Sequence, residues 1–184
     1  MLLWLTLAVL WSTPCWADQM YGNARGTYFS STPDNTNDIS GIRVSISLIG
    51  IIRSVQLRYG SNWSGIYGVR GGWAEEFLLG PDEYIVGLVG SHGIYISYLV
   101  VYTNLGRWAP LGMGRGYSFT ASPNEPGKIL TGIFGRTHGL GITGIGFKWD
   151  YPLADQPPTP APIPALSTRP KEFTQLHTAL ACGL

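Results

Sequence analysis

The chain has 184 residues, of which 45% are hydrophobic, enough for one domain with a packed core and hardly enough for two. Charged residues make up only 12%, about half the usual share, and 25 residues are glycines, a composition typical of turn-rich all-β proteins. The formal net charge of +1 gives no global attraction to nucleic acid or to an anionic membrane, so no nucleic-acid partner is predicted.

The amino-terminal segment, MLLWLTLAVLWSTPCWADQ, has the pattern of a secretory signal peptide. Its apolar run, Leu2 to Trp11, is too short to cross a bilayer as a helix, so no membrane span is predicted. A buried amino-terminal helix would need a polar face, which the run lacks. Cys15 and Ala17 occupy the positions where small residues precede a cleavage site, so we expect residues 1–17 to be removed after Ala17 and the protein to be secreted into the extracellular space.

Residues 18–153 are predicted to form one domain built only of strands. Apolar and polar residues alternate in GIRVSISLIG (41–50) and SVQLRYG (54–60), and further strand-like segments follow at 75–80, 83–90, 94–103, 129–135 and 141–149. Turn sequences rich in Gly, Pro, Asn and Asp separate these segments. About ten or more short strands indicate a sandwich, a barrel or a prism.

Residues 154–184 have a different composition. The run QPPTPAPIPALSTRP cannot supply ladder hydrogen bonds, which predicts a disordered, flexible tail with polyproline character. Cys182 lies in this tail and is the only cysteine left after cleavage, so an internal disulfide is excluded for the mature chain. The alternatives for Cys182 are a free thiol or a disulfide-linked dimer.

Motifs of catalysis are missing from the sequence. The three histidines do not form a metal-ligand pattern with cysteine, and no phosphate-binding loop or serine-nucleophile motif occurs. Glu75–Glu76 and Asp82–Glu83 are adjacent pairs that point to opposite faces of a strand, so we interpret them as solvated charges. The chain is therefore predicted to be a non-enzymatic protein without metal or cofactor.

Three short motifs indicate modification or binding. Asn62-Trp63-Ser64 is an N-glycosylation sequon in a turn, and we expect Asn62 to carry a glycan. Glycine-flanked loops at 22–26 and 139–143 would let backbone N–H groups approach a ligand closely.

The order and spacing of several segments resemble one family. The segments are Met20-Tyr21-Gly22, Tyr28-Phe29-Ser30, 41–45, 55–60, 104–107 and 144–152. Together they resemble the jacalin-related lectins, and within them the zymogen granule protein 16 family with its salivary and prostatic spermine-binding branches. The resemblance covers roughly residues 20–152.

The resemblance implies a fold and a site. The implied fold is a β-prism of the jacalin type (β-prism I), with three four-stranded Greek-key sheets. The implied ligand is a glycan or glycoprotein, held at one end of the prism by the first glycine-rich loop and a late GxxxD loop. Carried onto this sequence, the carbohydrate-binding residues would be Gly22, Asn23, Arg25, Gly26, His92, Tyr95, Gly139, Leu140, Gly141 and Thr143.

The late loop departs from the family pattern, because Thr143 stands where the family has an acidic, acceptor-only side chain. Ordinary mannose binding is therefore not expected. Arg25 lies beside the expected site, and Arg43, Arg58, Arg70 and Arg136 lie elsewhere on the domain. These arginines are either ordinary solvated residues or, in the sharper hypothesis, give the site a preference for acidic or sulfated glycans. The resemblance implies an exocrine secretion, such as saliva, as the place of action. The alternative is a β-prism scaffold without sugar binding that serves as an extracellular interaction or signalling factor. Polyamine binding is a weaker alternative, since the tail contains almost no acidic residues.

Overall fold

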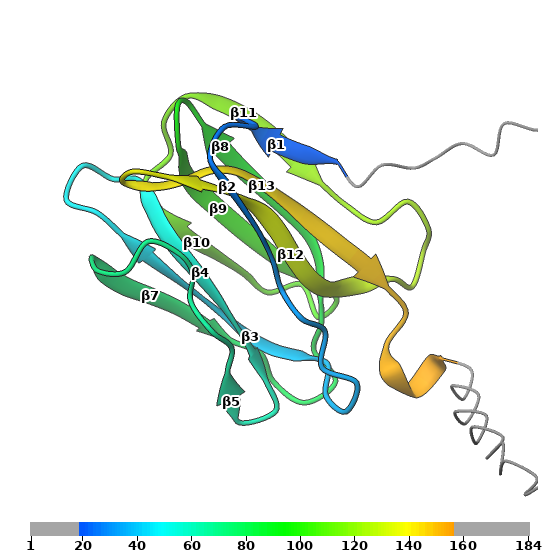
Figure 1. Cartoon of the computed structure of the whole chain (residues 1–184). Coiled ribbons are helices and arrows are strands. Elements are labelled where there is room, and N and C mark those ends of the chain that lie inside the picture. The colour runs from blue at the N-terminus through cyan, green and yellow to red at the C-terminus, as the bar shows by residue number, and fades with distance from the viewer. Residues whose placement is uncertain (1–18, 157–184) are drawn as a thin grey trace, which may run out of the picture.

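The structure, a computed structural model, describes residues 19–156 and consists of three antiparallel sheets around a shared interior (Figure 1). The first sheet has the strand order β1-β13-β12-β2, and the second has the order β10-β9-β8-β11. The third has the order β5-β4-β3-β7, with the short strand β6 also paired to β4. This arrangement confirms the β-prism. The third sheet differs from the expected four strands because two short strands, β5 and β6, share one edge of β4.

The strands have the following bounds. The first sheet contains β1 (Met20–Gly22), β2 (Thr27–Ser30), β12 (Ile129–His138) and β13 (Gly141–Asp150). The second contains β8 (Ile85–His92), β9 (Ile96–Thr103), β10 (Trp108–Gly112) and β11 (Tyr117–Ala121). The third contains β3 (Ile39–Ile46), β4 (Ile52–Tyr59), β5 (Asn62–Trp63), β6 (Tyr67–Gly68) and β7 (Trp73–Leu78).

Alternation along the strands places one face of each sheet in the core. In β3, Ile42, Val44 and Ile46 are completely buried, whereas Arg43 and Ser45 between them are partly exposed. Burial of one such aliphatic side chain contributes about 1.5–3 kcal/mol. The core unites the inner faces of all three sheets, so each sheet depends on the other two for its burial.

Two strands are shorter than the alternation of their sequence suggests. β3 ends at Ile46, and Ser47 to Gly50 form a turn in which the Gly50 N–H donates to the Ser47 carbonyl oxygen at 2.9 Å. Gly50 has a φ of 79°, which favours glycine and ends the strand there. β9 begins only at Ile96, which leaves Ile94 in the preceding turn. Leu48, Ile49 and Ile94 therefore lie outside the strands and are exposed.

The described fold extends slightly past the predicted domain end. Leu153–Asp155 form one 3₁₀ turn, η1, and the Leu153 N–H donates to the Asp38 carboxylate at 3.3 Å. The predicted signal peptide, the Pro-rich run and Cys182 lie outside the described residues. Within residues 19–156, no helix is long and apolar enough to cross a membrane.

Several glycines inside the strands face an aromatic ring on the neighbouring strand. Three such cross-strand pairs occur: Gly90 with Phe119, Gly135 with Phe29, and Gly146 with Phe134. In each pair the ring occupies space that a Cβ on the glycine would fill. The aromatic rings thus restore contacts that glycine alone would not make in a sheet.

We expect Gly135→Ala to lower the free energy of unfolding by about 1–3 kcal/mol, because the added methyl group would overpack the site. It would collide with the Gly144 carbonyl oxygen and with the Phe29 ring. Urea unfolding measures the change. Gly87→Ala in β8 is the matched control, since its methyl group would lie 3.9 Å from the nearest atom, the Ala121 carbonyl oxygen. Equal losses in the two variants would contradict this account of the glycines.

Candidate functional site

Loops from all three sheets converge at one end of the prism, toward the upper left of Figure 1. The first and second sheets meet where a Cβ on Gly22 would lie 3.1 Å from the Ile96 side chain, and one on Gly139 would lie 3.4 Å from the Tyr95 hydroxyl oxygen. The first and third sheets meet where a Cβ on Gly141 would lie 2.5 Å from the Ile52 carbonyl oxygen. We call this the loop end of the prism.

The β1–β2 loop, residues 23–26, is fastened directly onto β13. The Asn23 N–H donates to the Thr143 carbonyl oxygen at 2.8 Å, and the Asn23 side-chain oxygen accepts from the Arg25 N–H at 3.1 Å. Gly22 and Gly26 have φ values of 92° and 104°, and a side chain on Gly22 would meet the Thr143 carbonyl oxygen at 2.6 Å. These two glycines are needed for the loop to close on the sheet.

The Thr143 side chain points into the protein. It is only 2% exposed, and its hydroxyl lies 2.6 Å from the Arg25 carbonyl oxygen and 3.2 Å from the Arg136 carbonyl oxygen. A hydroxyl has one hydrogen to donate, and here it is directed to backbone acceptors. Thr143 therefore joins the β1–β2 loop to the end of β12. Its direct contact with a sugar stays a prediction.

The remaining predicted residues divide into two groups. Gly139 and Leu140 form the exposed β12–β13 turn next to the partly buried Tyr95, close to the loop at 23–26. The His92 ring instead lies against the second sheet, with its centroid 6.1 Å from the ring centroids of Tyr117 and Phe119. The structure thus brings Arg25, Tyr95, Gly139 and Leu140 to one end, while His92 packs beside them on aromatic side chains.

Arginines gather at the loop end. Arg25, Arg70 and Arg115 are exposed, and Arg53 and Arg136 are partly exposed. Arg136 donates to the Gly26 carbonyl oxygen at 2.8 Å, and Arg53 donates to the Arg70 carbonyl oxygen at 2.9 Å, so both also hold loops in place.

The sequence indicated only Arg25 as an arginine of the site, and it did not place Arg53, Arg70, Arg115 or Arg136 there. Counting residues from each hairpin turn would have shown that Arg53, Arg115 and Arg136 all lie near strand ends. Arg43 and Arg58 do not belong to this group. Arg43 forms a salt bridge of 2.8 Å with Glu76 and lies over Trp63, and Arg58 lies near the other end of β4.

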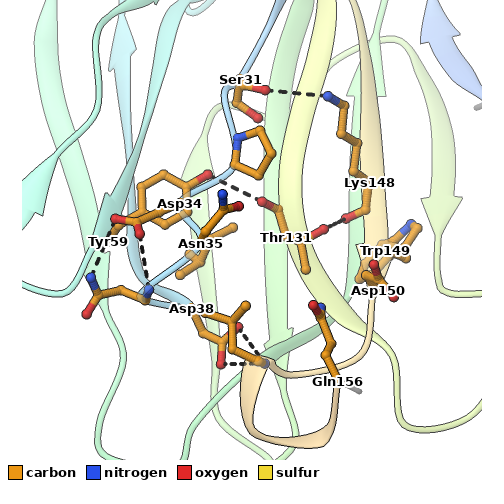
Figure 2. Close-up of a pocket in the computed structure, with 14 residues that line it drawn as sticks. Ser31, Asp34, Asn35, Asp38, Tyr59, Thr131, Lys148, Trp149, Asp150 and Gln156 are labelled. Carbon is orange, nitrogen blue, oxygen red and sulfur yellow. Dashed lines mark hydrogen bonds between the residues drawn. The ribbon is translucent and has the colours of Figure 1, made fainter. Parts of the chain in front are cut away.

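A pocket of about 440 Å³ opens at the opposite end of the prism (Figure 2). The β2–β3 loop supplies Asp34 and Asp38, and β13 supplies Lys148, Trp149 and Asp150. The Lys148 ammonium group donates to the Ser30 hydroxyl at 2.7 Å, and the Tyr59 hydroxyl donates to the Thr131 carbonyl oxygen at 3.3 Å. The sequence did not predict this pocket, because its lining residues come from segments that are far apart along the chain.

The carboxylates of this pocket differ in their environments. Burial raises the pKa of Asp38, against the opposing effect of the Leu153 N–H, and the charge of Asp155 raises it further. Hydrogen bonds from Thr36 and Asn37 lower the pKa of Asp34, which is partly exposed. Burial raises the pKa of Tyr59 to about 12. Asp34 therefore keeps its negative charge to a lower pH than Asp38 does.

One predicted solvated pair is contradicted by the structure. Glu83 is only 3% exposed, and its carboxylate accepts from the Gly80 N–H at 2.8 Å and from Arg107 at 2.6 Å. These bonds tie the β7–β8 loop to the β9–β10 loop. Glu83 is therefore a structural anchor, which its position in a polar turn sequence did not reveal.

Residues 19–148 match the family model described as the jacalin-like lectin domain. The chain belongs to the jacalin-like lectin family. Prostatic spermine-binding protein of Mus musculus is 38% identical over 149 residues, which are 81% of this chain and 75% of that protein. Zymogen granule membrane protein 16 of Homo sapiens is 37% identical over 134 residues, which are 72% of this chain and 79% of that protein.

A solved structure shares both the sequence and the fold. The crystal structure of a prostate-specific WGA16 glycoprotein lectin is 44% identical, with a TM-score of 0.68 over 73% of this chain and 98% of that chain. The resemblance inferred from the sequence is thereby confirmed, and the family supports carbohydrate binding as the general function.

We expect Thr143→Val to lower the free energy of unfolding by about 1–3 kcal/mol, because the buried hydroxyl that faces the Arg25 and Arg136 carbonyl oxygens is lost while the side-chain shape is kept. Thr143→Ser retains the hydroxyl and is the matched control. Urea unfolding gives the stability, and hydrogen exchange at the Asn23 amide reports whether the loop at 23–26 has opened. A valine variant as stable and as protected as the serine variant would show that the hydroxyl does not fasten this loop.

Proposed function

We propose that this chain is a secreted, non-enzymatic glycan-binding protein that prefers acidic or sulfated glycans. The observation that carries the proposal is the contrast between two neighbours at the loop end. Thr143 is buried and directs its hydroxyl to the Arg25 carbonyl oxygen, whereas Arg25 itself is exposed. The site therefore offers a ligand a cation in place of the carboxylate that the family pattern implies.

Arginine chemistry suits a sulfate or carboxylate group. The planar guanidinium group can donate two parallel hydrogen bonds to such an anion. A hydrogen bond to a charged group contributes about 1.5–3 kcal/mol, against about 1 kcal/mol for a neutral one. A difference of that size corresponds to roughly tenfold in affinity. Arg136, partly exposed beside the same loop, adds positive charge.

Relatives and surface features support the secretory part of the proposal. The relatives include proteins named as a prostatic protein, a zymogen granule protein and a glycoprotein lectin. Asn62 is exposed at the start of β5, where an attached glycan would meet solvent. We therefore propose cleavage after Ala17, glycosylation at Asn62 and an exocrine secretion as the place of action.

Polyamine binding is a second candidate, favoured by the pocket at the opposite end. Asp34, Asp38 and Asp150 line it together with Tyr59 and Trp149, so it offers carboxylates and aromatic faces to a flexible cation. One relative is named a spermine-binding protein.

Calorimetry with spermine tests this candidate. Binding that is lost in an Asp34→Asn, Asp150→Asn double variant would support it, and no heat of binding with the folded protein would end it.

A glycan array tests the main proposal, with the full secreted chain probed on neutral and sulfated glycans at about 0.15 M and about 1 M salt. We expect binding to sulfated glycans that falls at high salt and that weakens roughly tenfold in Arg25→Gln. Arg58→Gln is the matched control, because Arg58 lies near the far end of β4.

The other outcomes of the array distinguish the alternatives. Binding to neutral mannosides that Arg25→Gln leaves unchanged would overturn the charge preference and keep the lectin function. A folded protein that binds no glycan on the array would favour the extracellular interaction scaffold, for which the inward-facing hydroxyl of Thr143 is the supporting observation.

A further inference from the structure

Large apolar side chains protrude from the turns at the loop end. The side chains and their exposed fractions are Leu48 with 94%, Ile49 with 64%, Ile94 with 73%, Met113 with 46% and Leu140 with 50%. We call these five residues the apolar rim. Single exposed apolar residues are ordinary, whereas several at one end of a small domain mark an interaction surface.

The members of the apolar rim are neighbours in space although they come from different sheets. Leu48, Ile49 and Leu140 line one shallow groove of about 340 Å³ between the β3–β4 turn and the β12–β13 turn. Met113 lies beside the β3–β4 turn, since a Cβ on Gly50 would be 3.2 Å from its sulfur. Ile94 adjoins Tyr95, whose hydroxyl lies next to Gly139. Leu48, Ile49, Met113 and Leu140 therefore form one surface, and Ile94 protrudes from the β8–β9 turn at the same end.

The backbone of the β3–β4 turn does not require apolar residues. The turn is closed by hydrogen bonds from the Gly50 N–H to the Ser47 carbonyl oxygen and from the Ser47 N–H to the Ile51 carbonyl oxygen, both at 2.9 Å. Polar side chains at the two tip positions would leave both bonds intact and would be better solvated. Leu48 and Ile49 contribute little to the core, so their side chains are available for a contact outside the described fold.

Positive charge surrounds the apolar rim. Arg25, Arg70 and Arg115 are exposed at the same end, and Arg53 lines the groove with Leu48 and Leu140. Within residues 19–156, one carboxylate lies close to this surface, that of Glu75. It accepts from the Gly112 N–H at 2.8 Å and from the Trp73 indole at 3.3 Å.

Negative charge gathers at the opposite end of the prism. Five aspartates lie there outside salt bridges: Asp34, Asp38, Asp82, Asp150 and Asp155. The small net charge of the chain thus conceals a separation of charge along the prism, and a separated charge orients a molecule in an external field.

We propose that the loop end docks on an anionic lipid bilayer. Leu48, Ile49 and Ile94 insert between the lipid headgroups, and the exposed arginines bind lipid phosphate groups. Apolar side chains that enter the interface, combined with nearby Lys or Arg, are the two contributions that hold peripheral proteins on anionic membranes. A fluid interface suits this surface because the apolar tips protrude from separate turns, whereas a protein partner would need a matching pocket for each tip.

Docking in this way would set the orientation of the whole molecule. The loop that carries Arg25 would face the membrane, where acidic headgroups and glycans of membrane components are concentrated. The aspartate-rich end and Gln156, where the described chain ends, would point away from the anionic surface. The proposal does not depend on sugar binding, so the two can fail separately.

Vesicle flotation with the full secreted chain tests the proposal. We expect binding to phosphatidylcholine vesicles that contain about a third phosphatidylserine at about 0.15 M salt, and little binding to phosphatidylcholine alone. The double variant Leu48→Ser, Ile49→Ser should bind at least roughly tenfold more weakly. The double variant Arg70→Gln, Arg115→Gln should also bind more weakly and should lose most of the salt dependence.

Leu105→Ser is the matched control, since Leu105 is a 61% exposed leucine in the β9–β10 turn at the opposite end. It should bind vesicles like the unaltered protein. Thermal unfolding of each variant confirms that the fold is kept. An unaltered protein that ignores anionic vesicles would overturn the proposal.

Binding that Leu48→Ser, Ile49→Ser leaves intact would also overturn it, in favour of a purely electrostatic anion site. Self-association that this double variant abolishes, without any vesicle binding, would assign the apolar rim to a second copy of the chain. Sedimentation velocity at several protein concentrations measures that outcome.

Discussion

Close backbone approach around the start of β13 is the constraint on which the loop end depends. Glycines make it possible: a Cβ on Gly22 would meet the Thr143 carbonyl oxygen, one on Gly141 would meet the Ile52 carbonyl oxygen, and one on Gly144 would meet the Asn23 carbonyl oxygen. The close backbone contacts that these glycines allow hold the β1–β2 loop on the first sheet and bring the third sheet against the start of β13. The glycine-rich sequence of β13 is therefore required by the prism itself, whatever ligand the site takes.

The close backbone contacts at the start of β13 also change the interpretation of Thr143 in the loop at 139–143. In a family that uses a carboxylate at this position, a threonine could be regarded simply as a lost sugar contact. Here the Thr143 hydroxyl bonds to backbone carbonyls of the β1–β2 loop and of β12, so it has a structural task that a carboxylate, which only accepts hydrogen bonds, could not perform. Because the Thr143 hydroxyl faces inward, the exposed surface of the loop end is dominated by the positive charge of Arg25 and the neighbouring arginines.

Surface charge and apolar exposure combine at one end of the molecule. Arginines and protruding apolar turns share the loop end, while aspartates gather around the pocket at the other end. A glycan reader and a membrane-docking surface are compatible on this arrangement, because both use the arginines and only the second uses Leu48 and Ile49. The two ends of the prism thus have distinct chemistry, although the chain as a whole is nearly neutral.

The sequence by itself determined the all-β class, most of the longer strands and the glycine-flanked turns, because alternation and turn residues are local patterns that survive without knowledge of the partner strand. The β-prism followed from the resemblance to the jacalin-related lectins. The sequence misjudged Ser47 to Gly50, where the alternation continued past the end of β3, and it treated Glu83 as solvated. Only the tertiary structure decided that Thr143 faces inward, that five arginines gather at one end, and that Asp34, Asp38 and Asp150 share a pocket. Each of these depends on which strand ends meet across three sheets, and such contacts join residues that are far apart in the chain.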